Sequence, residues 1–182
     1  MAELGPVVWP PAPLRTERLM LREPEAGDRA TYIDLFASSE VRTYLGGPRP
    51  RAELESAVPE VPGRRPGVFA VDYDGAMIGI VTLDRRDAER PGHVRAGAGE
   101  AELSYMLLPE AWGRGYALEA CVAALGWFAD AFPGEPVVLC TQVANDRSVR
   151  VAEKLKFTEL ERFEEFGAEQ WFGVWSSVPW SG

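Results

Sequence analysis

Apolar residues along the chain recur with two spacings, and the changes between them predict where strands and helices lie. Short alternating or continuous apolar runs, typical of strands, occupy residues 19–22, 68–73, 77–83, 100–108, 137–143, 158–166 and 170–176. Apolar positions at helical spacing occupy residues 27–37, 116–132 and 145–155, with shorter helices predicted at 38–45 and 51–58. In the 38–45 helix we expect Val41, Tyr44 and Leu45 to face inward.

The order of these elements indicates an α+β fold. Asp74-Gly75, between two strand runs, predicts a tight hairpin turn. The strand–helix–strand passage from 100 to 143 predicts a right-handed parallel crossover, whereas hairpins on either side of it are antiparallel. We therefore expect one twisted, mixed, mostly antiparallel sheet with helices on both faces.

The chain shows no internal repeat and no interior linker, so we expect a single domain over residues 14–178. Residues 1–13 are rich in proline and read as an extended arm. We expect this arm to be disordered, with packing on a neighbouring subunit as the alternative.

The run from Trp112 to Ala120 carries the clearest chemical signal. Gly113 and Gly115 stand between a predicted strand and the start of the longest predicted helix. The first N–H groups of a helix have no internal partner and carry partial positive charge, and glycine lets an anion approach the main chain. We therefore expect a phosphorylated ligand here; the alternative is a tight turn without a ligand.

Two common phosphate loops do not fit this run. A dinucleotide fingerprint needs Gly or Ala at the sixth place, where this chain has Leu118. A nucleoside-triphosphate loop needs Gly-Lys-Ser or Gly-Lys-Thr, which the run lacks.

Composition narrows the choice of partners. The net charge of −9 argues against general nucleic-acid binding, which depends on basic patches. It is compatible with a cationic acceptor, although solubility alone also explains it. The chain has no apolar run near the roughly 20 residues of a membrane helix, and its start lacks the features of a secretion signal.

The cysteines and the single histidine offer little for catalysis. Cys121 and Cys140 stand among apolar neighbours, which is typical of buried, reduced thiols in the cytoplasm. His93 lies in a predicted loop. With only one histidine we expect no zinc site and no metal.

Four segments together resemble the GNAT acyltransferase family, and within it the bacterial-type branch that includes ribosomal-protein N-terminal acetyltransferases. They are Thr16–Arg22, Ala101–Leu107, Trp112–Ala120 and Asn145–Phe157, and the resemblance spans residues 14–176. The third segment is similar to the family's pyrophosphate loop, Gln/Arg-x-x-Gly-x-Gly/Ala. Gly115 and Ala117 fit its last two places, while Trp112 stands where Gln or Arg is usual.

The resemblance implies a GNAT domain with about six or seven strands, in which the central parallel strands four and five splay apart. It also implies acetyl-coenzyme A as co-substrate, with the pantetheine arm beside residues 106–108. The cofactor-binding residues that it implies are Met106, Leu107, Leu108, Gly113, Arg114, Gly115, Tyr116, Ala117, Leu118, Asn145 and Ser148.

The catalytic groups are harder to assign. Many members of the family carry a Tyr near the leaving sulfur, at the position that Ala152 occupies here. Ser148 is our candidate for the acid, directly or through water, and Glu102 is our candidate base. The alternatives are a helix-start hydroxyl for Ser148 and an exposed strand carboxylate for Glu102. A main-chain N–H near Leu107 would polarise the carbonyl.

The resemblance implies an N-acetyltransferase for a primary amine, either a protein N-terminal α-amine or a small molecule such as an antibiotic, polyamine or amino acid. One alternative is a non-catalytic, coenzyme A-binding regulatory module; another is a transferase for a different acyl group. A homodimer is also compatible with the branch, with the aromatic stretch Trp171–Trp180 as its surface, or else as an ordinary sheet strand.

Overall fold

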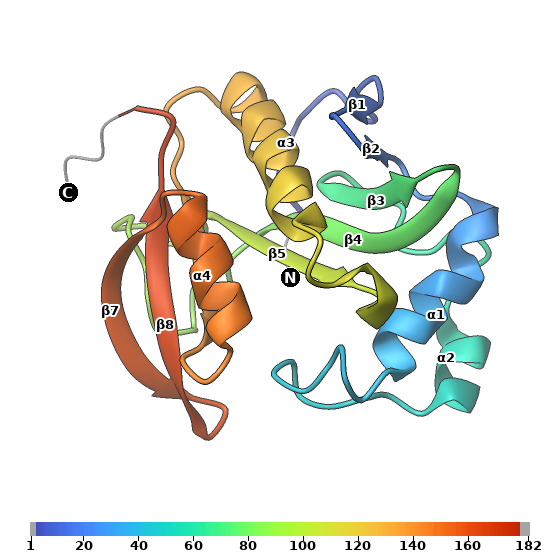
Figure 1. Ribbon diagram of the computed structural model, residues 1–182. Coiled ribbons are helices and arrows are strands. Elements are labelled where there is room, and N and C mark those ends of the chain that lie inside the picture. Colours follow the sequence, from blue (N-terminus) through green and yellow to red (C-terminus); the bar gives the residue numbers. More distant parts are fainter. Residues whose placement is uncertain (1–2, 179–182) are drawn as a thin grey trace.

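The computed structural model describes residues 3–178, which form one eight-stranded sheet flanked by helices (Figure 1). The strands are β1 (Leu14–Arg15), β2 (Met20–Arg22), β3 (Val68–Tyr73), β4 (Ala76–Arg85), β5 (Ala101–Leu107), β6 (Val137–Gln142), β7 (Thr158–Glu165) and β8 (Ala168–Trp175). The helices are α1 (Arg29–Ala37), α2 (Arg51–Ala57), α3 (Tyr116–Ala131) and α4 (Asp146–Lys154), with short 3₁₀ turns at Ala26–Asp28 and Pro109–Ala111.

The sheet order is β1-β2-β3-β4-β5-β6-β8-β7, and only the β5–β6 pair is parallel. The predicted mixed, mostly antiparallel sheet is therefore confirmed. Its eight strands exceed the expected six or seven because the two-residue β1, which pairs with β2, is too short to show a pattern. The β5–β6 register covers only Ala101 with Val137 and Glu102 with Val138, so the two strands splay apart beyond that point.

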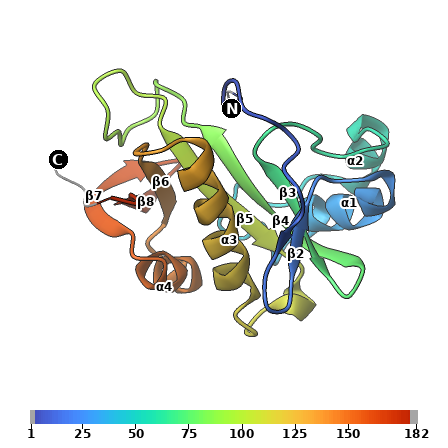
Figure 2. The same ribbon diagram turned by 90° about the horizontal axis from the view of Figure 1, so that it is seen from above.

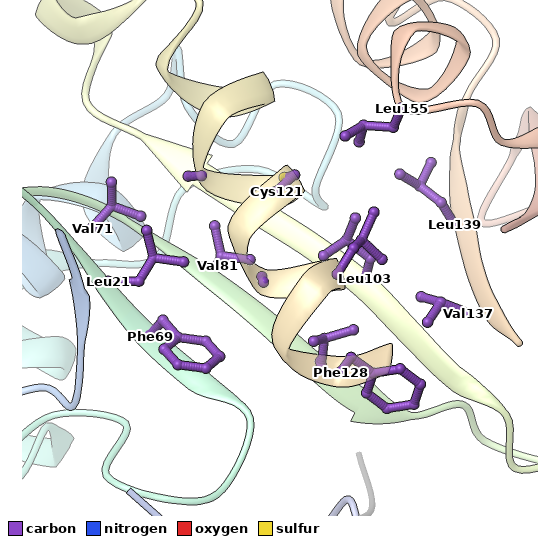
Figure 3. Close-up of a cluster of buried hydrophobic side chains, with 14 of the residues drawn as sticks. Leu21, Phe69, Val71, Val81, Leu103, Cys121, Phe128, Val137, Leu139 and Leu155 are labelled. Atoms are coloured by element: carbon purple, nitrogen blue, oxygen red, sulfur yellow. The ribbon is translucent and has the colours of Figure 1, made fainter. Parts of the chain in front are cut away.

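Helices cover both faces of the sheet, as expected (Figure 2). One face packs against α3 and α4, where side chains such as Phe69, Leu103 and Phe128 form the main core (Figure 3). The other face packs against α1 in a smaller cluster that contains Leu35 and Ile80. Burial of each large apolar side chain contributes about 1.5–3 kcal/mol, so the main core fixes α3 against the strands.

The expectation of a disordered arm is wrong for residues 3–13. Leu4 is only 1% exposed, and Arg85 Nε donates to its carbonyl oxygen at 3.0 Å. The ring of Trp9 lies edge-on to Phe69 and Trp127, with centroids 5.0 and 5.5 Å away. The prolines do stiffen this segment, but its two apolar anchors hold it on the core. Residues 1 and 2 of the predicted arm lie outside the described residues.

The predicted helix at 38–45 is also wrong, because this segment forms successive turns instead. Tyr44 and Leu45, expected to face inward, are 36% and 43% exposed. The Arg42 guanidinium donates to the carbonyl oxygens of Gly47, at 2.6 Å, and of Leu45. The Arg42 side chain therefore binds the carbonyl groups at the end of this turn segment, where Gly46 and Gly47 both have φ values of 83°.

The aromatic stretch near the C-terminus does not form a free surface where it is described. Strand β8 lies between β6 and β7, and Trp171 and Phe172 are buried. This part of the proposed dimer surface is therefore an inner strand of the sheet. Trp180 lies outside the described residues.

Candidate functional site

The glycine run between β5 and α3 adopts a conformation that only glycine takes readily. Gly113 and Gly115 have φ values of 73° and 79°, in the left-handed region. A Cβ built on Gly113 would meet nothing within 4 Å. The loop therefore lies open on the surface, immediately before the first turn of a 16-residue helix.

The main-chain amides of this loop are available to a ligand. The first helical hydrogen bond runs from Glu119 N to Gly115 O at 3.1 Å. Within residues 3–178, none of the amides from Gly113 to Leu118 donates to another protein group. These free donors, together with the positive end of the α3 dipole, form a suitable place for an anion.

Arg18 ties this loop to the opening strand. Its guanidinium donates to Arg114 O at 2.8 Å and to Glu119 Oε2 at 2.7 Å, and lies 4.7 Å from the centroid of the Tyr116 ring. Thr16 Oγ1 donates to Glu119 Oε1 at 2.6 Å. Burial alone would raise the pKa of Glu119, but these hydrogen bonds and the charge of Arg18 hold it below its usual value.

This role of Arg18 was not predicted from the sequence. The Thr16–Arg22 segment was read only as an opening strand, and Arg18 lies 96 residues before Arg114. No local spacing rule connects two residues that far apart.

The splay between β5 and β6 exposes one edge of β5. Leu108 N donates to Ile78 O at 2.9 Å, on the β4 side. Because backbone groups alternate along a strand, the N–H and C=O of Leu107 point toward β6, where the β5–β6 register has already ended. The Leu107 carbonyl accepts a hydrogen bond from Trp112 Nε1 at 2.9 Å, which leaves its second lone pair and the Leu107 N–H.

Side chains around this edge divide between the two faces. Met106 and Leu108 pack against the α1 cluster, whereas Leu107 is buried in the main core. No side chain of these three residues therefore points into the splay, and only Leu107 directs its main-chain N–H and C=O there, because Leu108 bonds β4 and its carbonyl accepts from Ala111 N.

The second motif begins α4 beside this splay. Asn145 is the N-cap of α4, and its Oδ1 accepts from Ser148 N at 3.3 Å. The Ser148 hydroxyl accepts in turn from Tyr105 Oη at 3.2 Å. Strand β5 and the start of α4 thus meet through the hydroxyl groups of Tyr105 and Ser148.

Tyr105 was not among the predicted site residues. Burial raises the pKa of its phenol, with a small opposing effect of the hydrogen bond to Ser148. The phenol is therefore protonated at any ordinary pH. A tyrosine among apolar strand neighbours needs a partner for its hydroxyl, and that need was the only sequence signal for this contact.

Two positions in the Asn145–Phe157 segment differ from the family's usual residues, Ala152 where Tyr is common and Lys156 where Gly is usual. Ala152 is fully buried against the core, so nothing there takes the place of the usual Tyr. Lys156 has a φ of 70°, so it keeps the left-handed geometry that Gly normally adopts, at a cost of about 1 kcal/mol. Phe157 N donates to Ala152 O at 3.0 Å, which closes the helix end.

Glu102 is not the exposed carboxylate that the alternative interpretation expected. Its Oε1 lies 2.7 Å from Arg86 Nη1 and its Oε2 lies 3.3 Å from Arg90 Nη1. Arg90 also contacts Glu165 at 2.8 Å, and the Arg86 side chain is fully buried. Both oxygens of Glu102 are therefore engaged in ion pairs.

The sheet face opposite α3 is open near the middle of β5. Ser104 is exposed, and its hydroxyl lies 2.5 Å from that of the buried Thr82. The turn segment 39–46 reaches this side of the sheet, since Gln142 Nε2 donates to Tyr44 O at 3.3 Å. A second molecule can approach the splay from this face, opposite the glycine loop.

Comparison with known proteins agrees with this geometry. The sequence profile of the acetyltransferase (GNAT) domain family matches residues 18–158. The chain therefore belongs to the GNAT acetyltransferase family. An acetyltransferase of this family from Bacillus anthracis has a similar structure, with a TM-score of 0.74 and 19% identity over 91% of this chain and 98% of that one.

Two other solved structures share the fold at low identity. RimL, the ribosomal L7/L12 α-N-protein acetyltransferase, has a TM-score of 0.69 and 14% identity over 94% of this chain and 99% of its own. The aminoglycoside acetyltransferase AAC(6')-Ib in complex with coenzyme A has a TM-score of 0.69 and 16% identity over 87% and 95%.

No helix within residues 3–178 has the length and apolar character needed to cross a membrane. The same residues contain no group of three or more His, Cys, Asp or Glu side chains arranged to hold a metal ion.

Proposed function

We propose that this protein is an N-acetyltransferase that moves an acetyl group from acetyl-coenzyme A to a primary amine. The observation that carries the proposal is the set of unpaired amides from Gly113 to Leu118 at the start of α3. Family membership and the splay between β5 and β6 support it.

The proposed site uses main chain more than side chain. The pyrophosphate binds the amides of residues 113–118, and Arg114 adds charge beside it. The pantetheine arm lies in the splay beside residues 106–108, where the Leu107 N–H and the second lone pair of its carbonyl are free. Asn145 contributes its amide NH₂ group, because its Oδ1 already caps α4.

The chemistry needs a neutral amine, a polarised carbonyl and a stabilised thiolate. The acetyl thioester supplies the acyl group; the amine nitrogen forms the new C–N bond, and the C–S bond breaks. The Leu107 N–H, directed into the splay, polarises the carbonyl oxygen. Ser148 accepts from Tyr105, so its own proton is free to donate to the departing sulfur.

Glu102 is not assigned as the base in this proposal. Its two ion pairs with Arg86 and Arg90 occupy both oxygens, and they tie the 86–100 loop to β5. We propose instead that solvent takes the proton of the amine, which has an unperturbed pKa of about 10.4 if the acceptor resembles lysine.

The acceptor is proposed to approach from the face of Ser104, past the 39–46 turns. The net charge of −9 favours a cationic amine there. The two enzymes described above are named for a ribosomal protein and for aminoglycosides as acceptors. We propose an acceptor of one of these two kinds, a protein α-amine or a small polyamine-like molecule. Two free cysteines fit a reducing compartment, and we propose the cytoplasm.

The first test combines thiol release with a charge placed in the loop. Purified protein is incubated with acetyl-coenzyme A and a panel of amines, and amine-dependent release of free thiol is expected. Gly115→Glu is expected to weaken coenzyme A binding at least about 100-fold by calorimetry, because a carboxylate would face the pyrophosphate. Gly134→Glu is the matched control, since Gly134 has a φ of 77° and open space but lies beyond the far end of α3.

Unchanged affinity for coenzyme A in Gly115→Glu would refute the position of the pyrophosphate.

The second candidate function, a non-catalytic coenzyme A-binding module, is favoured by Ala152 in place of the usual Tyr. It predicts tight coenzyme A binding with no thiol release for any amine. Release from longer acyl thioesters, but not from acetyl-coenzyme A, would instead identify another acyl donor.

A further inference from the structure

Free positive charge gathers around the glycine loop. Most arginines of this acidic chain form ion pairs, for example Arg22, Arg65 and Arg86. Within residues 3–178, eight Arg and Lys side chains form no ion pair, and three of them, Arg15, Arg29 and Arg42, belong to the N-terminal part of the chain. The other five lie on the glycine loop, on α4 or just after it: Arg114, Arg147, Arg150, Lys154 and Lys156.

Arg147 is held against the glycine loop. It lies in the first turn of α4, and its guanidinium carbon is 5.0 Å from the centroid of the Trp112 ring. Trp112 directly precedes Gly113 and is itself fixed by its hydrogen bond to Leu107 O. Two elements that follow different strands, the loop after β5 and the start of α4, therefore bring this charge against Trp112, the residue before the free amides.

The contact with Trp112 leaves the donors of Arg147 available. A cation–π contact places the guanidinium over the face of the ring and uses none of its N–H groups in a hydrogen bond. Arg147 is exposed and forms no hydrogen bond or ion pair with any described residue. In a chain with a charge of −9, an arginine kept clear of carboxylates is placed for an anion from outside the protein.

We propose that Arg147 binds a phosphate group of the acyl donor and that Trp112 is the positioning residue that holds it there. This inference rests on the proposed function, because the donor must occupy the amides of residues 113–118. Planar N–H donors suit phosphate oxygens, and a charged donor strengthens each hydrogen bond. Arg147 then adds a charge from α4 to a site otherwise built from main-chain amides of α3.

The test measures coenzyme A binding to the full chain by calorimetry. Arg147→Gln is expected to weaken binding roughly tenfold, which corresponds to about 1.4 kcal/mol, and to make the affinity less sensitive to salt. Lys154→Gln is the matched control. It removes the same charge about 10 Å further along α4 and is expected to leave the affinity unchanged.

A second substrate separates binding of phosphate from support of the fold. S-acetylpantetheine carries the thioester and the pantetheine arm without any phosphate. Its KM is expected to be the same for wild type and Arg147→Gln, with equal melting temperatures for the two proteins.

Three results would overturn the inference. Wild-type affinity for coenzyme A in Arg147→Gln would remove Arg147 from the site while leaving the proposed function intact. An equal loss with both substrates would indicate a structural role only. Wild-type protein that does not bind coenzyme A at all would refute the proposed function, and this inference with it.

Discussion

At the scale of single residues, the contacts of the site depend on partners that the sequence does not reveal. The resemblance implied Ser148 and Asn145 as site residues. Neither the Ala101–Leu107 segment nor the Asn145–Phe157 segment indicated that Tyr105 would contact Ser148. The Arg18–Arg114 and Arg147–Trp112 contacts also join residues far apart in the sequence, 96 and 35 positions. Spacing rules predict which residues share an element; they do not predict which side chains meet across elements.

Tyr105→Phe tests the hydroxyl pair. Loss of the Tyr105 hydroxyl leaves Ser148 without the donor that orients it. We therefore expect kcat to fall roughly fivefold to tenfold, the effect of about one hydrogen bond. The KM for acetyl-coenzyme A should stay the same. Ser148→Ala should lower kcat by a similar factor, and the double variant should be little worse than either single one. Fully independent effects in the double variant would show that the two hydroxyls do not work as a unit.

The expected dependence of rate on pH follows from the amine, because the Tyr105 phenol does not ionise in the working range. Burial raises the pKa of Tyr105 above that of a free tyrosine, about 10, so the phenol does not ionise in the working range. The neutral fraction of the amine grows as pH rises. We therefore expect kcat/KM to rise with pH and to show no alkaline decline below about pH 10. A decline centred near pH 8 would point to a different acid.

At the scale of elements, periodicity predicted most helices and strands within a residue or two, including α2, α3, α4 and the β3–β4 hairpin. The parallel crossover from β5 to β6 was also predicted correctly. The helix predicted at 38–45 was wrong, and the turns that replace it are accompanied by hydrogen bonds from Arg42 to the carbonyls of Leu45 and Gly47. The loop before α3 was predicted from its glycines, but its attachment to the first strand by Arg18 was not.

Arg18→Gln tests that attachment. Without the contacts to Arg114 O and Glu119, the loop and the first turn of α3 should exchange their amide hydrogens faster in mass spectrometry. Coenzyme A affinity should fall by roughly threefold to tenfold, because the amides are less well ordered before binding. Arg162→Gln, which breaks a similarly exposed pair with Glu159 on β7, is the control and should change neither. Wild-type exchange in Arg18→Gln would show that the loop holds its shape without this contact.

At the scale of the whole molecule, the N-terminal segment belongs to the core. Sequence reasoning separated residues 1–13 from the domain because prolines dominate the segment and no periodicity appears in it. Leu4 and Trp9 are isolated apolar residues, too far apart in the sequence to form a periodic pattern. Leu4 packs beside Gly67 in the main core, a site that forms only when segments distant in the sequence come together. Information of this kind is absent from any local window of the sequence.

Leu4→Ala measures how strongly this segment contributes. Leu4 is 1% exposed and touches the Gly67 backbone region, so its truncation should lower the free energy of unfolding by about 2–3 kcal/mol. Val8→Ala, at a side chain that is 87% exposed, should change it by less than about 0.5 kcal/mol. Denaturant unfolding of both variants provides the comparison, and equal stability would mean that the segment is only loosely attached.

The short β5–β6 register has a consequence for the sheet itself. The strands from β1 to β5 and the strands β6, β8 and β7 make two partial sheets that share a backbone seam of only two residue pairs. Beyond those pairs the two strands splay apart without further pairing, and helices α3 and α4 cover the gap from one side. A substrate that carries amide groups would hydrogen-bond to the main chain in the gap between β5 and β6. The sheet would then be most nearly continuous only while that substrate is bound.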